Sequence, residues 1–193
     1  GVTIQISAEE GVLPEGVTAT ASRVNEDVEA TVADRMTEDG KSVSSVMAFD
    51  INLWLGDQLL DSEIWGGSQK VTVTFSGWPI EENTAEADTV ETVYVETVYD
   101  NDKAAKEQIA NEEIEVAAAD VTNVVSVSEE IDIAEADISA VSFEAEHFSI
   151  YAVVGSTKYE DSYEMYPGET LRLYVDANGW SGEETWSSSS EHV

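Results

Sequence analysis

The chain has 193 residues, no cysteine and two histidines, and its 41 acidic residues against 8 basic ones give a formal net charge of -33. The lack of cysteine excludes disulfides, thiol catalysis and zinc-thiolate sites, and the negative charge disfavours nucleic-acid phosphates and anionic membrane surfaces as partners. Because 42% of the residues are hydrophobic, the chain has enough apolar material to fold around a core. We therefore expect a folded protein with no nucleic-acid partner, no membrane partner and no cofactor.

The N-terminal segment has the alternating pattern of β-strands. Val2–Ile6 predicts one strand and Val17–Ala21 a second. Between them, Gly11 to Gly16 includes Pro14, and glycine and proline favour turns. The simplest arrangement of these two strands is a hairpin.

A helical pattern follows. Val24, Val28, Val32 and Met36 recur every four residues until Gly40 interrupts the run. An asparagine at position 25 is a favourable N-cap, and the acidic residues after it suit the first turn of a helix. We expect one amphipathic helix over residues 25–36, with its apolar stripe against a sheet.

The remaining strong patterns are those of further strands. They cover Val46–Leu55, Lys70–Phe75, Thr89–Tyr99, Val121–Val127, Val141–Glu144 and Phe148–Val154. We expect Pro79 to end the second of these strands and Gly155-Ser156 to end the last, and we expect the acidic residues of Thr89–Tyr99 to face solvent. Lys103–Ala110 is alanine-rich and predicts a short helix. The sequence thus predicts a mainly β fold for residues 1–156, a β-sandwich of roughly seven to nine strands with one or two short helices.

Residues 157–193 have a different pattern. Pro167-Gly168-Glu169-Thr170-Leu171 reads as a turn entering a strand, and Thr185-Trp186-Ser187-Ser188-Ser189 follows. This segment resembles the opening of the bacterial immunoglobulin-like repeat family. The resemblance implies a partial immunoglobulin-like β domain at residues 157–193, which we expect to pack weakly on the first domain.

Motifs of turnover enzymes are missing. The sequence has no Gly-x-Ser-x-Gly elbow, no phosphate-binding glycine loop and no His-Glu-x-x-His motif. We interpret the acidic pairs as solvated surface; they are Glu81-Glu82, Glu112-Glu113 and Glu129-Glu130. Asp100-Asn101-Asp102 and Asp176-Ala177-Asn178-Gly179 offer oxygen ligands to calcium, but ordinary turns explain both equally well.

One constellation does suggest chemistry. His147-Phe148-Ser149 followed by Ile150-Tyr151 resembles the segment at which autoproteolytic domains of the ZU/UPA type, including function-to-find domains, cut between Phe and Ser. The longer run His-Phe-Ser-Ile-Tyr-Ala-Val-Val-Gly also resembles a recurrent ending of modules in surface proteins of gut Firmicutes. The resemblance implies that the Ser149 hydroxyl attacks the Phe148 carbonyl and that His147 serves as its base.

A purely structural interpretation of the same residues stays open. Phe148, Ile150 and Ala152 alternate with Ser149, Tyr151 and Val153, as in an ordinary strand, and His147 then marks the solvated entrance of that strand.

We expect the chain to be a stalk or spacer module of an adhesin on the surface of a Gram-positive bacterium, self-cleaving between Phe148 and Ser149. The alternatives are a ligand-binding adhesin domain, or a subunit of an extracellular fibre assembled by strand complementation. The expected partners are a protein or glycan on a host surface, or neighbouring copies of the chain. Exposed tryptophans in a groove would favour ligand binding and buried ones a spacer; the residues concerned are Trp54, Trp65, Trp78 and Trp180.

Overall fold

The computed structural model describes residues 1–38, 40–60, 71–98, 113–133 and 138–157. The chain divides into two compact units, Gly1–Tyr159 and Glu160–Val193. The second unit lies outside the described residues. Apart from Thr157, the predicted immunoglobulin-like segment is therefore not described, and the same holds for the predicted helix at Lys103–Ala110.

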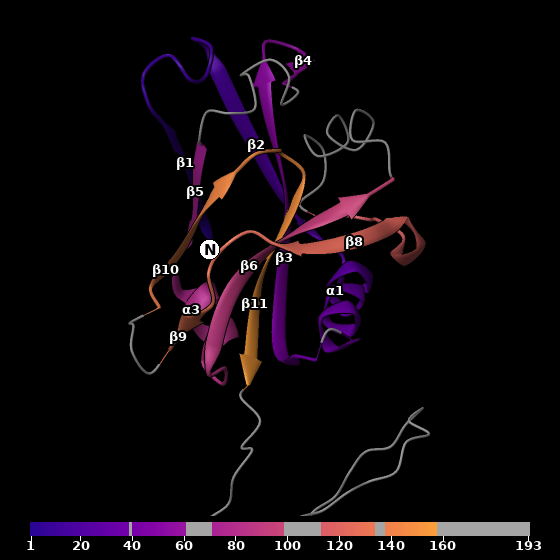
Figure 1. The fold of residues 1–193 in the computed structure, drawn as a ribbon. Helices are drawn as coiled ribbons and strands as arrows, with labels where there is room; N and C mark the ends of the chain where they lie inside the picture. The colour runs from indigo at the N-terminus through magenta and orange to yellow at the C-terminus, as the bar shows by residue number, and fades with distance from the viewer. Residues whose placement is uncertain (39, 61–70, 99–112, 134–137, 158–193) are drawn as a thin grey trace, which may run out of the picture. The chain divides into compact units, whose positions relative to one another are not determined.

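The described part of the chain is mainly β, as predicted (Figure 1). The larger sheet has eight strands: β2 (Val17–Val24), β3 (Ser42–Leu55), β4 (Gln58–Leu59), β6 (Thr89–Thr97), β7 (Glu113–Ile114), β8 (Val121–Ser126), β9 (Ile131–Asp132) and β11 (Ile150–Thr157). Its main order is β7-β2-β3-β11-β6-β8, with β4 paired to β3 and β9 paired to β6. The smaller sheet has the order β1-β5-β10 and comprises Thr3–Ala8, Val71–Ser76 and Ala140–Ala145.

Two helices accompany the sheets, α1 (Glu26–Glu38) and α3 (Trp78–Thr84), together with a 3-10 turn at Ala118–Asp120. Among the described strand pairs only β2 and β7 run parallel. Within the described ranges, no helix is both long enough and apolar enough to cross a membrane.

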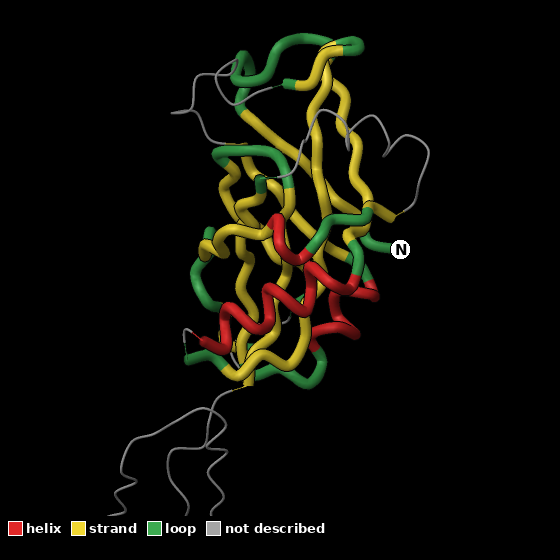
Figure 2. The backbone as a smooth tube through the Cα atoms, turned by 90° about the vertical axis from the view of Figure 1, so that its right-hand side faces the viewer, coloured by secondary structure: helices red, strands yellow, loops and turns green. Residues whose placement is uncertain are grey.

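The centre of the larger sheet is buried on both faces. Ile150, Ala152 and Val154 of β11 join a cluster with the apolar side chains of α1. Tyr151 and Val153 point the other way, into a cluster with residues of the smaller sheet. In Figure 2, seen from the side of α1, the helix lies across the strands. The two sheets form a β-sandwich, and α1 covers the outer face of the larger sheet.

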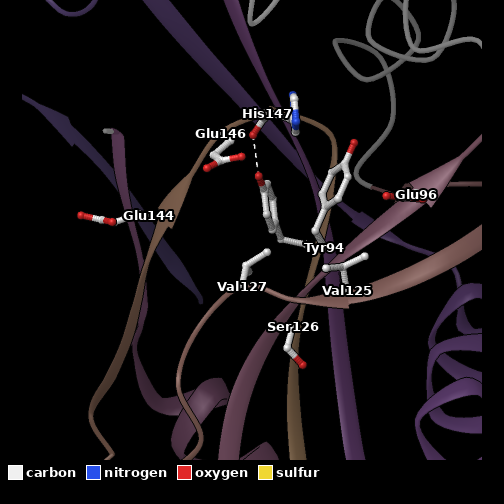
Figure 3. Close-up of a pocket in the computed structure, with 9 residues that line it drawn as sticks. Tyr94, Glu96, Val125, Ser126, Val127, Glu144, Glu146 and His147 are labelled. Carbon is white, nitrogen blue, oxygen red and sulfur yellow. Dashed lines mark hydrogen bonds between the residues drawn. The ribbon is translucent and has the colours of Figure 1, made fainter. Parts of the chain in front are cut away.

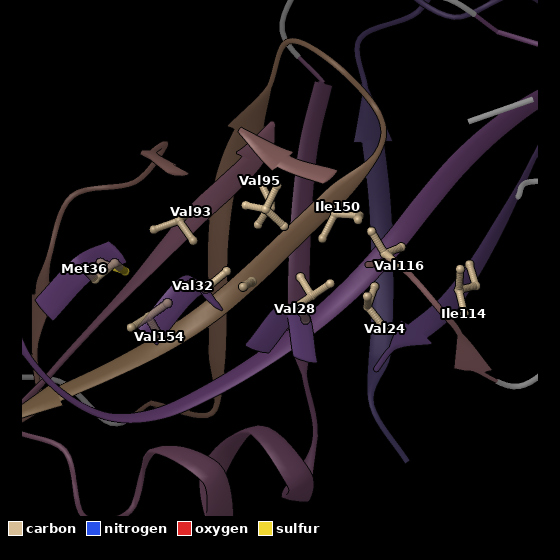
Figure 4. Packing of buried hydrophobic residues seen from close by; sticks show 13 residues of the cluster. Val24, Val28, Val32, Met36, Val93, Val95, Ile114, Val116, Ile150 and Val154 are labelled. Atoms are coloured by element: carbon tan, nitrogen blue, oxygen red, sulfur yellow. The ribbon is translucent and has the colours of Figure 1, made fainter. Parts of the chain in front are cut away.

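The predicted helix is present, and its stripe is buried as expected. Val28 and Val32 are 0% exposed and Met36 is 4% exposed, and they pack with Val24 at the end of β2 (Figure 4). Asn25 differs from its predicted role as a side-chain cap, because its amide oxygen accepts a hydrogen bond from Val116 N at 3.0 Å and its amide nitrogen donates to Val116 O at 3.2 Å. The asparagine thus extends the pairing of β2 with the segment after β7.

The predicted N-terminal hairpin is wrong. β1 pairs with β5 in the smaller sheet, whereas β2 pairs with β3 in the larger one. Ile4 and Ile6 of β1 pack on the cluster between the sheets, while Val24 of β2 faces α1. The long connection between them, with Gly11 and Gly16 both at a φ of 87°, lets the chain cross from one sheet to the other.

Two predicted strand ends also differ. Pro79 does not itself end β5; it lies in the first turn of α3, where a missing N–H interrupts no helical hydrogen bond. Gly155 does not end β11, which continues to Thr157 through a bulge between Gly155 and Ser156. A Cβ atom at Gly155 would lie 2.5 Å from Ser45 Oγ and 2.9 Å from Ala87 Cβ, so these two side chains leave no room for a larger residue here.

A buried ion pair corrects the prediction that the acidic residues of β6 face solvent for Glu91, whereas Glu96 is exposed as expected. The Glu91 side chain is only 4% exposed and pairs with the Lys41 ammonium, which also contacts Glu130 at 3.0 Å. Ser126 Oγ donates to the second Glu91 oxygen at 2.6 Å. Burial alone would lower the pKa of Lys41, but the hydrogen bonds and charges of Glu91 and Glu130 outweigh it and raise that pKa. Lys41 therefore keeps its charge beside the buried carboxylate.

The α1 stripe provides a first test. Val28→Ala should lower the free energy of unfolding by about 1–3 kcal/mol, because it removes buried methyl groups and leaves a cavity. The matched control is Val125→Ala, at a side chain 38% exposed, which should cost less than about 0.5 kcal/mol. Urea unfolding monitored by circular dichroism measures both. Equal losses in the two variants would contradict the packing of α1 on the sheet.

The ion pair provides a second test. Lys41→Ala should destabilise the protein by about 1–3 kcal/mol, since it leaves the Glu91 carboxylate buried without its cation. Arg35→Ala is the control, because the Arg35–Glu38 pair is 51% and 72% exposed and such pairs contribute little. Denaturant unfolding at neutral pH compares the two variants. A cost for Lys41→Ala no larger than that for Arg35→Ala would show that the pair is not structurally important.

Candidate functional site

The His147-Phe148-Ser149 segment lies in the connection between β10 and β11. The predicted strand Phe148–Val154 therefore begins two residues later than expected, at Ile150. β10 ends at Ala145 and β11 begins at Ile150. Because β10 belongs to the smaller sheet and β11 to the larger, these few residues carry the chain from one layer of the sandwich to the other. The Phe148–Ser149 peptide bond is thus part of an inter-sheet crossover.

The three residues differ in exposure. His147 is exposed, Phe148 is half-buried against apolar residues between the sheets, and Ser149 is 2% exposed. The carbonyl oxygen of Ser149 accepts a hydrogen bond from Ile51 N at 2.9 Å. The Tyr151 hydroxyl donates to the carbonyl oxygen of His147 at 2.5 Å. Both sides of the Phe148–Ser149 bond are therefore fixed by hydrogen bonds to the sandwich.

The backbone at this crossover has no left-handed residue. Throughout the described ranges, positive φ angles occur only at glycines. The conformation of His147 to Ser149 therefore lies in regions of φ that any amino acid adopts.

Aromatic rings surround the crossover. The Tyr94 ring lies 5.2 Å from the Tyr151 ring and 5.8 Å from the His147 imidazole, measured between centroids. The Phe143 ring also packs against Tyr151, with 4.6 Å between the ring centroids. Burial raises the pKa of Tyr151 strongly, and the neighbouring Tyr94 adds to this effect. Tyr151 therefore stays protonated and keeps donating to the His147 carbonyl.

A pocket of about 440 Å³ opens beside these rings (Figure 3). It is lined by residues of β6, β8 and β11 and of the end of β10 with the crossover: Tyr94, Glu96, Val125, Ser126, Val127, Glu144, Glu146, His147 and Tyr151. Its volume falls within the range of small-ligand sites in proteins. Among the predicted site residues, only His147 lines it.

The sequence did not indicate Tyr94 or Glu96 as site residues. Tyr94 comes from a strand whose alternation predicts only that every second side chain faces the sandwich core. Its closeness to His147 results from the pairing of Tyr94 with Tyr151 across β6 and β11. Tyr151 belongs to the segment that resembles autoproteolytic domains. Its hydrogen bond to the His147 carbonyl could not be predicted, because it depends on the turn between the sheets.

The other candidate sites contribute less. Glu81, Glu82 and Glu129 are exposed as expected, and Glu130 is exposed but pairs with Lys41. Within the described ranges there is no group of three His, Asp or Glu residues placed to hold a metal ion. Both acidic segments considered for calcium lie outside the described residues.

The tryptophans do not form a groove in the described part of the chain. Trp54 is 6% exposed and donates its indole N–H to Thr20 Oγ1 at 2.8 Å, while Trp78 is 66% exposed on α3. Trp65 and Trp180 lie outside the described residues.

Comparisons with known proteins add no relative. No family model matches the chain, no curated protein matches it, and no solved structure matches it.

Tyr151 provides a test of the crossover geometry. Tyr151→Phe should cost about 1 kcal/mol at pH 7, because the His147 carbonyl loses its donor. Since the folded-state pKa of Tyr151 is raised, its contribution is fully present below about pH 10, the pKa of an unfolded tyrosine, and is lost as the pH rises beyond that value. Urea unfolding at pH 7 and at about pH 11 should therefore show a smaller alkaline loss for Tyr151→Phe than for the wild type. Equal alkaline losses would contradict the burial of this hydroxyl.

Proposed function

We propose that the chain is an extracellular stalk or spacer module of a Gram-positive bacterial surface protein that cuts itself once between Phe148 and Ser149. The observation that carries the proposal is the position of this bond at the crossover between the two sheets. The resemblance of His147-Phe148-Ser149 to autoproteolytic segments supplies the reaction.

The crossover position means that a cut leaves both new ends held. The N-terminal fragment keeps β1 to β10, and the C-terminal fragment begins with the whole of β11. β11 is paired along its length with β3 and over most of it with β6, and its apolar side chains are buried on both faces. These contacts do not involve the Phe148–Ser149 bond. Cleavage thus produces a joint held without a covalent link.

The reaction needs only residues of this segment and one water molecule. The Ser149 hydroxyl oxygen bonds to the Phe148 carbonyl carbon as the carbon–nitrogen bond breaks, which moves the acyl group from the Ser149 nitrogen to its oxygen. His147 takes the hydroxyl proton and delivers it to the departing amine. Water then hydrolyses the ester and releases the Phe148 carboxylate and the Ser149 hydroxyl.

Positioning assists this attack. Ile51 N holds the Ser149 carbonyl and the Tyr151 hydroxyl holds the His147 carbonyl, so the scissile peptide lies between two fixed points. Fixing the nucleophile near its target lowers the entropic part of the barrier. Ser149 is tightly packed and His147 is exposed, so the water that completes hydrolysis must enter from the His147 side.

Intact-mass measurement tests the proposal. Denatured protein should separate into two fragments, residues 1–148 and 149–193, while native protein elutes as one particle on size exclusion. Ser149→Ala should abolish cleavage by removing the nucleophile, and His147→Ala should slow it by about 10²-fold or more, as expected for loss of a general base.

Ser142→Ala is the matched control, because Ser142 is an exposed serine on β10 that lies outside the crossover. This variant should cleave like the wild type. A single intact mass for the wild type after prolonged incubation would refute self-cleavage and leave the crossover a structural connection. Equal cleavage in the Ser149→Ala variant would assign any cut to a contaminating protease.

A further inference from the structure

The pocket beside the crossover has a chemical character that the proposed cleavage does not use. Its rim and walls carry three carboxylates, from Glu96 on β6, Glu144 on β10 and Glu146 after β10. None of its described lining residues is lysine or arginine. Neither Glu96 nor Glu146 forms an ion pair with any lysine or arginine in the described part of the chain. An anionic ligand would be repelled here, and a cationic one attracted.

The second feature of the pocket is an aromatic wall. Tyr94 is half-buried between Tyr151 and His147, and its ring forms part of the pocket lining. In Figure 3 the Tyr94 ring lies beside His147, with Glu96 on one side and Glu144 and Glu146 on the other. A ring face attracts a cation placed within about 6 Å of its centroid, and neighbouring carboxylates strengthen that attraction.

The wall also has an apolar part. Val125 is 38% exposed, one of the few large apolar side chains of the described residues that face solvent, and it lines the pocket with Val127. Long cationic side chains bury their methylene stems on such surfaces while their charged ends stay near carboxylates. Val125 and Val127 offer that surface next to Tyr94 and Glu96.

Other ligand classes fit this lining less well. A bare metal ion requires several oxygen or imidazole ligands around one point, and the described residues contain no such group. The carboxylates of the lining repel phosphate, sulfate and carboxylate ligands. A cation with an apolar stem matches the carboxylates, the ring and the valines together.

We propose that the pocket formed by β6, β8 and the β10–β11 crossover binds a lysine or arginine side chain presented by a basic segment of a partner protein. The pocket is larger than one side chain needs, so the backbone on either side of the cationic residue enters with it. Burial, with Glu96 and Asp50, raises the pKa of Tyr94, which keeps its hydroxyl neutral near the bound cation.

The test uses two short peptides that differ only in charge. One is Gly-Gly-Arg-Gly-Gly with both ends blocked, and the other has the uncharged analogue citrulline in place of arginine. Each is titrated into the full chain labelled with nitrogen-15, with the amide shifts followed by NMR. The arginine peptide should shift amides of the pocket, those of Glu96, Val125 and Glu146 among them, and binding should weaken with added salt. The citrulline peptide should bind at least about tenfold more weakly.

Variants assign the binding to the pocket. Glu96→Gln and Glu146→Gln should each weaken binding of the arginine peptide by about two- to fivefold, as expected for one exposed charge. Tyr94→Leu should weaken it by about tenfold, whereas Tyr94→Phe keeps the ring and should bind like the wild type. Glu82→Gln, which removes an exposed charge from α3, is the matched control and should have no effect. Thermal midpoints of the Tyr94 variants check that these proteins are folded.

Equal binding of the two peptides would overturn the proposal, as would shifts confined to residues outside the pocket or the absence of any shift at millimolar peptide. A loss in Glu82→Gln as large as that in Glu96→Gln would likewise overturn it, since binding would then follow net charge and not the pocket. None of the variants alters His147, Phe148 or Ser149, so this result is independent of the outcome for self-cleavage.

Discussion

β11 lies between β3 and β6 in the centre of the larger sheet, and its side chains are buried on both faces. One face packs under α1, and the other packs against the smaller sheet. A strand in this position requires apolar residues at almost every position instead of alternate ones, and Ile150 to Val154 satisfies that requirement. The two layers that flank the larger sheet meet the same strand, so their positions depend on it.

The site follows from the same constraint. Between the end of β10 and the start of β11, the chain must pass from the smaller sheet to the centre of the larger one within four residues. This places His147, Phe148 and Ser149 at the edge of the inter-sheet core. The pocket beside Tyr94 is lined by residues of β6, β8, β10 and this crossover. The proposed cleavage site and the proposed binding pocket therefore share one turn of the chain.

Much of the fold was predictable from the sequence. The α1 stripe, the strand positions and the mainly β class follow from local periodicity, which depends on neighbouring residues alone. The pairing of strands was harder to predict, because β1 has the same alternation of residues whether it pairs with β2 or with β5. The burial of Glu91 could not be predicted either, because it depends on Lys41, which is fifty positions away in the chain and reaches the same side of the sheet.

The candidate site was predictable only in part. His147, Phe148 and Ser149 are consecutive, so a motif finds them together. Tyr94 and Glu96 reach them through the pairing of β6 with β11, and Val125 through the pairing of β8 with β6. No local sequence pattern determines those two strand registers, so the pocket could be found only from the structure.

Native-state hydrogen exchange of the full chain tests the central role of β11 most directly. The amides of Ala152, Val153 and Val154 should exchange only through global unfolding, with an exchange free energy equal to that from urea unfolding. The edge strand β1 should exchange through smaller local openings. Exchange of the β11 amides at rates equal to or faster than those of β1 would contradict the account.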